Sequence, residues 1–185
     1  MFAEVRSHLI LVSTSLVLCC GVYPAALLLF GRSLAPESAA GSLVAGPDGK
    51  VVGSRLLAQE FKSPKYFQPR PSAVGYNAAG SGGSNLAASN SKLRERVAEQ
   101  LKGTTGTVPA DTVTTSGSGL DPHLTLAAAK QQAERVAATR GRAQADVIAV
   151  LDGLAFTPLD GLAGEPLVNV LELNLRLDER LPINR

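Results

Sequence analysis

Residues 9–30 form a run of 22 residues without a charged side chain, LILVSTSLVLCCGVYPAALLLF. At about 1.5 Å per residue, a helix of this length spans the roughly 30 Å hydrocarbon core of a membrane. A cleaved signal sequence has a shorter apolar region, of about 7–15 residues, and no clear Ala-x-Ala cleavage site follows this run. We therefore expect an uncleaved transmembrane helix in an N-terminal segment, residues 1–32, followed by a domain of residues 33–185.

Three residues of this span favour contact with another helix. Gly21 and Ala25 are small residues four positions apart, which lets a neighbouring backbone approach closely. Pro24 can kink the helix, and such a kink is tolerated where neighbouring helices satisfy the freed carbonyls. Small residues are also common in membrane helices without this role, so both interpretations stay open. Arg6 and Arg32 flank the span almost evenly, so charge alone does not predict which side the domain occupies.

The composition excludes several functional classes. A net charge of +2 provides no basic face for nucleic acid. Cys19 and Cys20 lie together in the apolar run, and only His8 and His123 could supply imidazole, so a disulfide framework and a multi-ligand zinc site are not expected. No P-loop pattern is present, and the Ser, Asp and His of residues 116–123 lie too close in sequence for a catalytic triad. We predict no catalytic residue, no metal site and no enzyme activity of the chain on its own.

The pattern of residues 33–185 predicts a mixed α/β domain of the α+β-like type behind the single transmembrane helix. Residues 31–41 indicate a linker, and residues 43–52 indicate a β-hairpin around a Pro-Asp-Gly turn. Leucines that alternate with polar residues over 171–177 indicate a half-buried strand. The remaining expected elements are helices at 91–102, with Gly103 as its stop, at 124–140, ending at Gly141, and at 145–151, ending at Gly153, and a Thr-rich connection at 104–115.

The main candidate site is the loop that precedes the longest of these soluble helices. Asp121 is expected to cap that helix, with Pro122 at its first position. The glycines permit φ > 0, so successive backbone N–H groups could converge on an anion at the helix start. A tight turn before a capped helix explains the same residues without any ligand. The candidate nucleotide or partner contacts are Ser116, Gly117, Ser118, Gly119, Leu120, Asp121, Pro122 and His123.

Three further residues are candidate partner contacts. Arg70 lies between two prolines that favour extended geometry, so its guanidinium is presented rigidly and could bind a carboxylate or phosphate. A structural ion pair is the alternative role for Arg70. Ser84 and Asn85 belong to a second low-complexity stretch, residues 78–90, which could form a flexible loop or an anion-binding nest.

Taken together, several segments in chain order resemble the C subunit of bacterial Kdp-type potassium-transporting ATPases. They are the N-terminal apolar run, KYFQPRPSA at 65–73, GSNL at 83–86, VPAD at 108–111, SGSGLDPH at 116–123 and GEPLVNVL at 164–171. The resemblance implies an accessory subunit with one span in the bacterial inner membrane and an extracytoplasmic domain. It also implies assembly with a channel-like potassium-translocating subunit, an ATP-hydrolysing P-type subunit and a small single-span subunit. Potassium is then the transported ion, and no tightly bound cofactor is expected.

The resemblance implies two alternative roles. In one, the subunit raises the ATP affinity of the pump subunit as a catalytic chaperone, with residues 116–123 in contact with nucleotide. In the other, it caps the external potassium entrance. A domain outside the membrane cannot reach cytoplasmic ATP, which favours the cap. A nucleotide-binding protein in its own right, and an anchored module for some other partner, are the alternatives outside a transporter.

Overall fold

The computed structural model describes residues 2–102, 106–161 and 164–183. The chain divides into two compact units, Met1–Leu43 and Val44–Arg185. In the first, α1 (Phe2–Leu16), a π-helical segment η1 (Val17–Val22) and α2 (Tyr23–Leu34) follow one another without interruption. Within this helix of 33 residues, a window of 18 residues has a mean hydropathy of 2.0, and the helix is long and apolar enough to cross a membrane.

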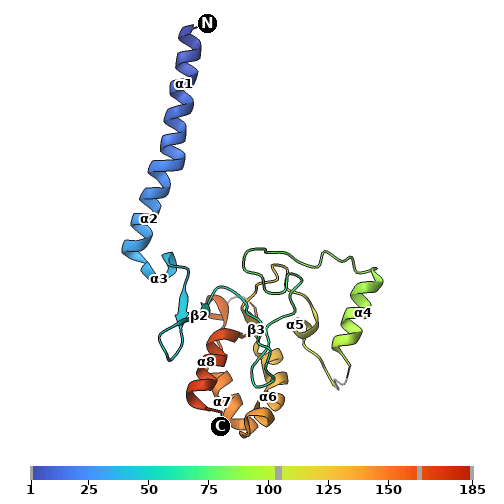
Figure 1. Cartoon of the computed structure of the whole chain (residues 1–185). Helices are drawn as coiled ribbons and strands as arrows, with labels where there is room; N and C mark the ends of the chain where they lie inside the picture. Colours follow the sequence, from blue (N-terminus) through green and yellow to red (C-terminus); the bar gives the residue numbers. More distant parts are fainter. Residues whose placement is uncertain (1, 103–105, 162–163, 184–185) are drawn as a thin grey trace. The chain divides into compact units, whose positions relative to one another are not determined.

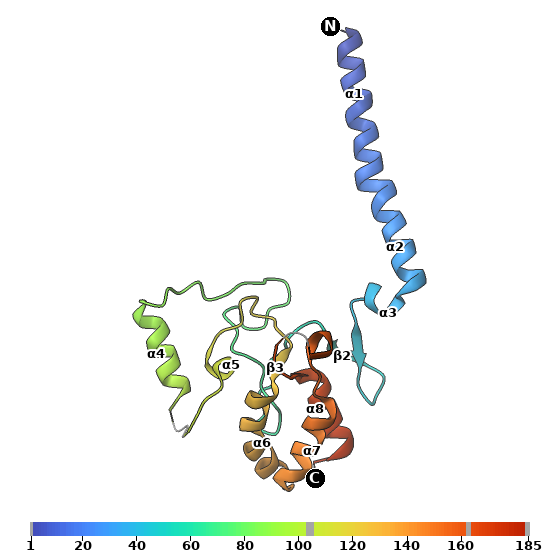
Figure 2. The same ribbon diagram turned by 180° about the vertical axis from the view of Figure 1, so that it is seen from behind.

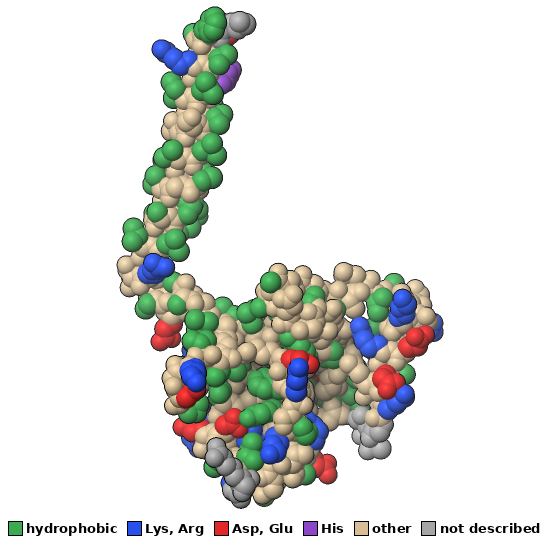
Figure 3. Space-filling view, in the orientation of Figure 1, with side chains coloured by type: hydrophobic (Ala, Val, Ile, Leu, Met, Phe, Trp, Pro, Cys, Tyr) green, Lys and Arg blue, Asp and Glu red, His purple; other side chains and the backbone are tan. Residues whose placement is uncertain are grey.

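The described side chains of this long helix are not buried within the chain, and Figure 3 shows apolar side chains along its length. The linker predicted for residues 31–41 is wrong for most of its length. The helix continues to Leu34, and a short helix α3 (Pro36–Ala39) follows. Pro36 causes the interruption between them, because a proline disfavours helical geometry in the preceding residue, and Ala35 has φ −143°.

The core of the second unit lies among α6 (Leu126–Arg140), α7 (Gln144–Leu154) and α8 (Val170–Arg180), which lie together in both ribbon views (Figures 1 and 2). Apolar burial near 25 cal/mol per Å² is its main stabilising contribution. The largest apolar side chains that are fully enclosed there are Phe67, Leu124, Val136, Val147, Leu151, Val168, Val170, Leu173 and Leu177.

Two short strands lead directly into two of these helices. β3 (His123–Thr125) precedes α6, β4 (Leu167–Asn169) precedes α8, and the strands pair antiparallel. The first residue of each helix donates its N–H to the proline carbonyl that precedes the other strand. Leu126 bonds to Pro166 at 2.8 Å, and Val170 bonds to Pro122 at 2.9 Å. Each strand–helix unit therefore satisfies a helix-terminal donor of the other.

The remaining elements are short. The predicted hairpin is confirmed by β1 (Leu43–Ala45) and β2 (Val51–Ser54), and the predicted helix after residue 90 by α4 (Ser91–Gln100), which Asn90 caps. The Thr-rich connection contains a helical turn, α5 (Ala110–Val113), and a 3₁₀ turn η2 (Pro158–Gly161) precedes β4. The predicted stop at Gly103 lies outside the described residues. The mixed α/β character of the domain is confirmed.

The strand predicted at residues 171–177 is wrong, because this segment is the helix α8. Its buried side chains lie on one face of the helix, at Val170, Leu171, Leu173, Asn174 and Leu177. The polar Asn174 interrupts the apolar stripe, so the period-two alternation of the leucines is more visible in the sequence. Leucine also favours helices over strands, and Asn169 caps this one by accepting from the N–H of Glu172 at 3.2 Å.

The predicted start of the longest soluble helix is also wrong. Residues 123–125 are extended in β3, and the helix begins at Leu126, where the hydroxyl of Thr125 accepts from the N–H of Ala128 at 3.1 Å. Strand pairing with β4 prevails over the local capping pattern at Asp121. The predicted end at Gly141, with φ +64°, is confirmed, whereas α7 runs through Gly153 to Leu154.

Two amide side chains hold an extended segment against the helices. Asn174 accepts from the N–H of Phe67 at 2.9 Å and donates to its carbonyl at 3.0 Å. Gln132 makes the equivalent pair with Gln68, at 2.9 and 3.0 Å. These side chains replace the neighbouring strand that the segment lacks, and they fix the direction in which the chain enters the Pro-Arg-Pro sequence at residues 69–71.

Candidate functional site

Two glycine-rich segments that are far apart in the sequence lie against each other. We call residues 80–83 and 116–119 the paired glycine loops. The carbonyl of Ser118 accepts from the N–H of Gly82 at 2.8 Å and from the hydroxyl of Ser81 at 3.1 Å. Residues 71 and 72 hold the second loop as well, since Ser72 donates its hydroxyl to the carbonyl of Gly119 at 2.7 Å. The predicted loops are therefore parts of one bonded assembly.

The second of these loops uses its own serines to satisfy its amides. The hydroxyl of Ser116, which is buried, accepts from the N–H of Gly119 at 3.1 Å. The hydroxyl of Ser118 accepts from the N–H of Leu120, also at 3.1 Å. These amides are therefore engaged within the loop, and the loop leads into a strand. The helix N-terminus that would favour an anion is missing here, because the loop is followed by β3 and not directly by a helix.

The three glycines at this contact have different requirements. Gly119 has φ +69°, and a Cβ there would lie 2.6 Å from Cγ2 of Val74 and 2.8 Å from the carbonyl oxygen of Gly82. A Cβ on Gly83 would lie 3.0 Å from the carbonyl oxygen of Gly117. Gly117 itself has open space around its missing side chain and needs no left-handed conformation. Gly119 and Gly83 therefore permit the loops to approach, whereas Gly117 leaves its surface bare.

Asp121 connects the loop to the Pro-Arg-Pro segment and does not cap a helix. Its carboxylate lies 3.3 Å from Nη1 of Arg70 and accepts from the N–H of His123 at 3.0 Å. Nη2 of Arg70 donates to the hydroxyl of Thr114 at 3.4 Å. Hydrogen bonding from His123 is the largest cause that lowers the pKa of Asp121. Burial opposes this effect, and the charge of Arg70 adds to it. Arg70 thus makes the structural ion pair that was the alternative role.

An open depression of about 490 Å³ lies over the second glycine loop. Leu56 is 61% exposed beside it, and none of the residues that line it is basic. A surface of this kind offers apolar side chains, hydroxyls and backbone, which suits a protein better than a phosphate group. The lining residues are Leu56, Leu57, Ser81, Ser116, Gly117, Ser118, Leu120, Asp121 and Pro122.

The structure places the other predicted contacts as follows. Ser84 is half-buried and Asn85 is exposed with φ +52°, directly after the first glycine loop. Gly21 lies in η1 with open space around it, and Pro24 and Ala25 lie in the first turn of α2, all in the first unit. Ser72 and Leu56, which also belong to this region, are not predicted from the sequence. Neither residue has a local signal, because Ser72 meets Gly119 only through the fold.

His123 lies at the edge of this region. Its ring is one-third exposed and meets the ring of Phe156 edge-on at 5.5 Å, and Phe156 is 44% exposed. Phe156 also bridges to Leu167 at the end of β4. The predicted residues 116–123 thus run from the paired glycine loops to a partly apolar surface beside the β3–β4 pair.

These features define a class of protein with one candidate membrane span and one small mixed α/β domain. The candidate site of this domain exposes backbone and hydroxyl groups. The family model described as "KdpC: K+-transporting ATPase, c chain" matches residues 5–179. The chain belongs to this family.

Curated relatives agree with the family match over nearly the whole length. The potassium-transporting ATPase KdpC subunit of Parvibaculum lavamentivorans is 48% identical over 172 residues, which cover 91% of this chain and 92% of that protein. The corresponding subunit of Geobacter sulfurreducens is 41% identical, with 97% and 99% covered. That of Caulobacter vibrioides is 43% identical, with 98% and 96% covered. The chain is therefore a subunit of a potassium-transporting ATPase, and potassium is the transported ion.

Proposed function

We propose that the helix Phe2–Leu34 anchors this accessory subunit in the bacterial inner membrane and that the domain Val44–Arg185 lies outside the cytoplasm. The paired glycine loops then dock on the channel-like potassium-translocating subunit and cap its external entrance. The ATP-hydrolysing P-type subunit and a small single-span subunit complete the complex. The observation that supports the docking surface is the bare backbone at Gly117, beside an exposed leucine, in a loop that hydrogen bonds from Ser72, Ser81 and Gly82 hold in place.

A loop that several hydrogen bonds hold in one conformation suits a docking role for an energetic reason. Binding costs less conformational entropy when the surface is already held in its bound geometry. Ser72, Ser81 and Gly82 hold the loop from the outside, and Ser116 and Ser118 hold it from within. The partner then contacts a preorganised backbone surface, which stays accessible because Gly117 has no side chain to cover it.

The same contacts count against a nucleotide site in this loop. The amides of Gly119 and Leu120 already bond to serine hydroxyls, and the basic side chain of Arg70 is paired with Asp121. A rise in the ATP affinity of the pump subunit, the catalytic-chaperone role, would then arise through assembly and not through ATP held by residues 116–123. Isothermal titration of ATP into the full chain in detergent tests this. Sub-millimolar binding that is lost in Gly117→Val would favour a nucleotide-binding protein.

The docking proposal is tested by comparing Gly117→Leu with Gly153→Leu. Both glycines have open space and no left-handed conformation, so neither substitution should unfold the domain. We expect Gly117→Leu to lower both co-purification with the P-type ATPase in mild detergent and potassium-stimulated ATPase activity at least tenfold, with an unchanged melting temperature. Gly153→Leu should leave all three unchanged. Normal assembly and activity of Gly117→Leu would refute docking through this loop.

The position of the domain needs a separate experiment. A reporter that is active only in the cytoplasm, fused after Arg185, should be inactive, and a periplasm-specific reporter should be active. The opposite pattern would refute the cap. Failure of the wild-type chain to co-elute with a P-type ATPase would instead indicate an anchored module for another partner.

A further inference from the structure

The apolar helix changes its hydrogen-bonding register in its middle. In η1, between α1 and α2, the N–H of Tyr23 bonds to the carbonyl of Leu18, five residues earlier. In an α-helix the same N–H would bond to the residue four positions earlier, which is Cys19. The carbonyl of Cys19 therefore loses its usual donor to its neighbour.

The next possible donor for this carbonyl is absent for a chemical reason. In the π register the carbonyl of Cys19 would accept from residue 24, and Pro24 has no N–H. The carbonyl of Cys20 differs, because the N–H of Ala25 lies five residues ahead of it. Pro24 and the register change together thus isolate one carbonyl, that of Cys19, from both backbone donors that helical geometry provides.

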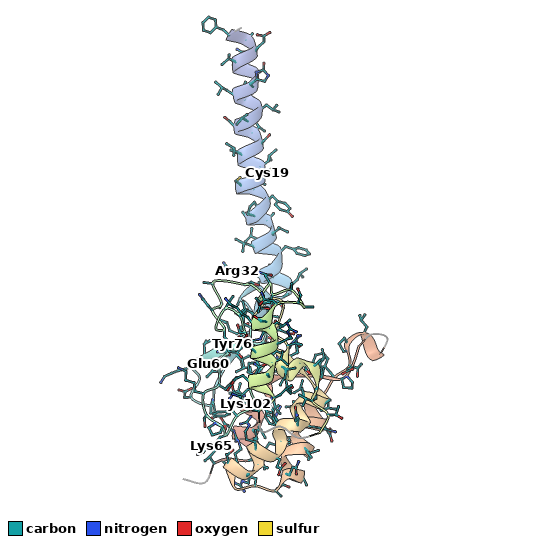
Figure 4. The ribbon with its side chains drawn as sticks, turned by 90° about the vertical axis from the view of Figure 1, so that its right-hand side faces the viewer. Cys19, Arg32, Glu60, Lys65, Tyr76 and Lys102 are labelled. Atoms are coloured by element: carbon teal, nitrogen blue, oxygen red, sulfur yellow. The ribbon has the colours of Figure 1, made fainter. Side chains whose placement is uncertain are left out.

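The hydroxyls of Ser13, Thr14 and Ser15 precede Cys19, and a hydroxyl on a helix bonds to a carbonyl three or four residues before it, so none of them reaches the carbonyl of Cys19. The hydroxyl of Ser7 bonds to the carbonyl of Ala3, and that of Ser33 bonds to the carbonyl of Leu29, toward the two ends. Figure 4 shows Cys19 in the middle part of this helix, far along the chain from Arg32. At this depth in a bilayer, water does not reach a lipid-facing carbonyl, and an unsatisfied peptide group is costly.

We propose that the carbonyl of Cys19 accepts a hydrogen bond from a polar side chain, bearing an O–H or N–H, on a transmembrane helix of another subunit. Gly21 lies in the same π-helical segment, and open space around it lets a neighbouring backbone come close. A hydroxyl or amide donor suits such close packing, because it satisfies the carbonyl without placing a charge in the hydrocarbon. This inference rests on the proposed insertion of the helix in the membrane.

The chain has only two cysteines, which makes the carbonyl directly observable. Growth on [1-¹³C]cysteine labels only the carbonyls of Cys19 and Cys20, and ¹⁵N-glycine identifies that of Cys20 by its bond to Gly21. The ¹³C signals are recorded for the full chain alone in bilayers and for the labelled chain in a complex with unlabelled subunits. We expect the Cys19 signal to move downfield in the complex, because a carbonyl shifts downfield when it accepts a hydrogen bond, and the Cys20 signal to stay.

Pro24→Ala restores an N–H and removes the need for an external donor. In this variant the Cys19 signal should be downfield both alone and in the complex, and recovery of the complex should fall several-fold. Pro36→Ala, which changes a proline outside the π-helical segment, should behave as the wild type. An identical Cys19 signal in the wild-type chain alone and in the complex would overturn the proposal. A downfield shift in the chain alone that depends on its density would overturn it in favour of a second copy. The reporter experiment tests insertion independently.

Discussion

Arg140 is the side chain whose removal should destabilise the domain most clearly. It ends α6 with a fully buried side chain. Its Nε donates to the carbonyl of Lys65 at 2.7 Å, its Nη1 to that of Leu181 at 3.2 Å, and its Nη2 pairs with Asp178 at 2.9 Å. The guanidinium also lies 5.1 Å from the centre of the Tyr66 ring. The guanidinium of Arg140 thus connects the extended segment at residues 65–68 with α6 and the end of α8.

The substitution Arg140→Met keeps most of the buried volume and removes every donor. Two carbonyls and the carboxylate of Asp178 then lose a donor. Breaking a fully buried ion pair from one side costs about 3–5 kcal/mol, but the side chain of Asp178 is 36% exposed and water compensates part of the loss, so the cost here is about 2–3 kcal/mol. We expect a loss of that size in the free energy of unfolding. In the double variant with Asp178→Leu, part of the loss should be recovered, because no charge is left without its partner. The hydroxyl of Tyr66, which donates to Asp178 at 3.0 Å, limits that recovery.

Urea denaturation of the full chain in detergent, followed by near-ultraviolet circular dichroism of the tyrosines, measures this difference. Arg176→Met is the matched control, because Arg176 makes an exposed pair with Glu179 on α8, and such pairs contribute about 0–1 kcal/mol. A loss below about 1 kcal/mol for Arg140→Met, similar to that of the control, would show that the buried guanidinium does not hold these segments together.

Three further predictions concern the candidate site and its support. Gly119→Ala should destabilise the domain by about 2–4 kcal/mol, because it combines left-handed strain with a close approach to the first loop, whereas Gly117→Ala should change stability by less than about 0.5 kcal/mol in thermal unfolding. Asp121→Asn should reduce the loss of stability at acid pH, because the folded pKa of Asp121 lies below its unfolded value of about 3.9. The stability that the carboxylate contributes is present above about pH 4 and disappears as the pH falls through the folded pKa. Urea titrations that show the same loss of stability at acid pH in variant and wild type would contradict this. Asn174→Leu should cost about 2–4 kcal/mol by leaving both backbone groups of Phe67 without partners, and equal unfolding midpoints for variant and wild type would contradict it.

Local patterns in the sequence predict those elements whose hydrogen bonds are themselves local. The hairpin at 43–54 follows from its turn residues, and α4 follows from Asn90 and an apolar stripe. The helix α8 could not be predicted from leucine spacing, because the side chain that completes its buried stripe is Asn174, whose partner Phe67 lies 107 residues away. From the sequence alone, a buried asparagine cannot be distinguished from one on the surface until its hydrogen-bond partner is known.

The candidate site also contains features that local sequence predicts and features that depend on distant partners. The conformational demands of Gly119 can be predicted from a Ser-Gly repeat, but its close contact with Gly82 cannot, since the two loops meet only in the folded chain. The role of Asp121 was predicted from its position before a proline, and the fold assigns it differently because Arg70 reaches it from 51 residues away. Arrangements that depend on such distant partners are visible only in three dimensions.

The reciprocal bonds between the two strand–helix units also bear on when the domain can fold. Leu126 needs the carbonyl of Pro166, and Val170 needs that of Pro122, so neither unit is complete until both segments exist. During synthesis, the native β3–β4 pair cannot form before residues 167–169 have left the ribosome, well after the residues of β3. Until residues 167–169 emerge, the N–H of Leu126 lacks its native acceptor and the central pairing of the domain is incomplete, so the native domain forms only after β4 has been made.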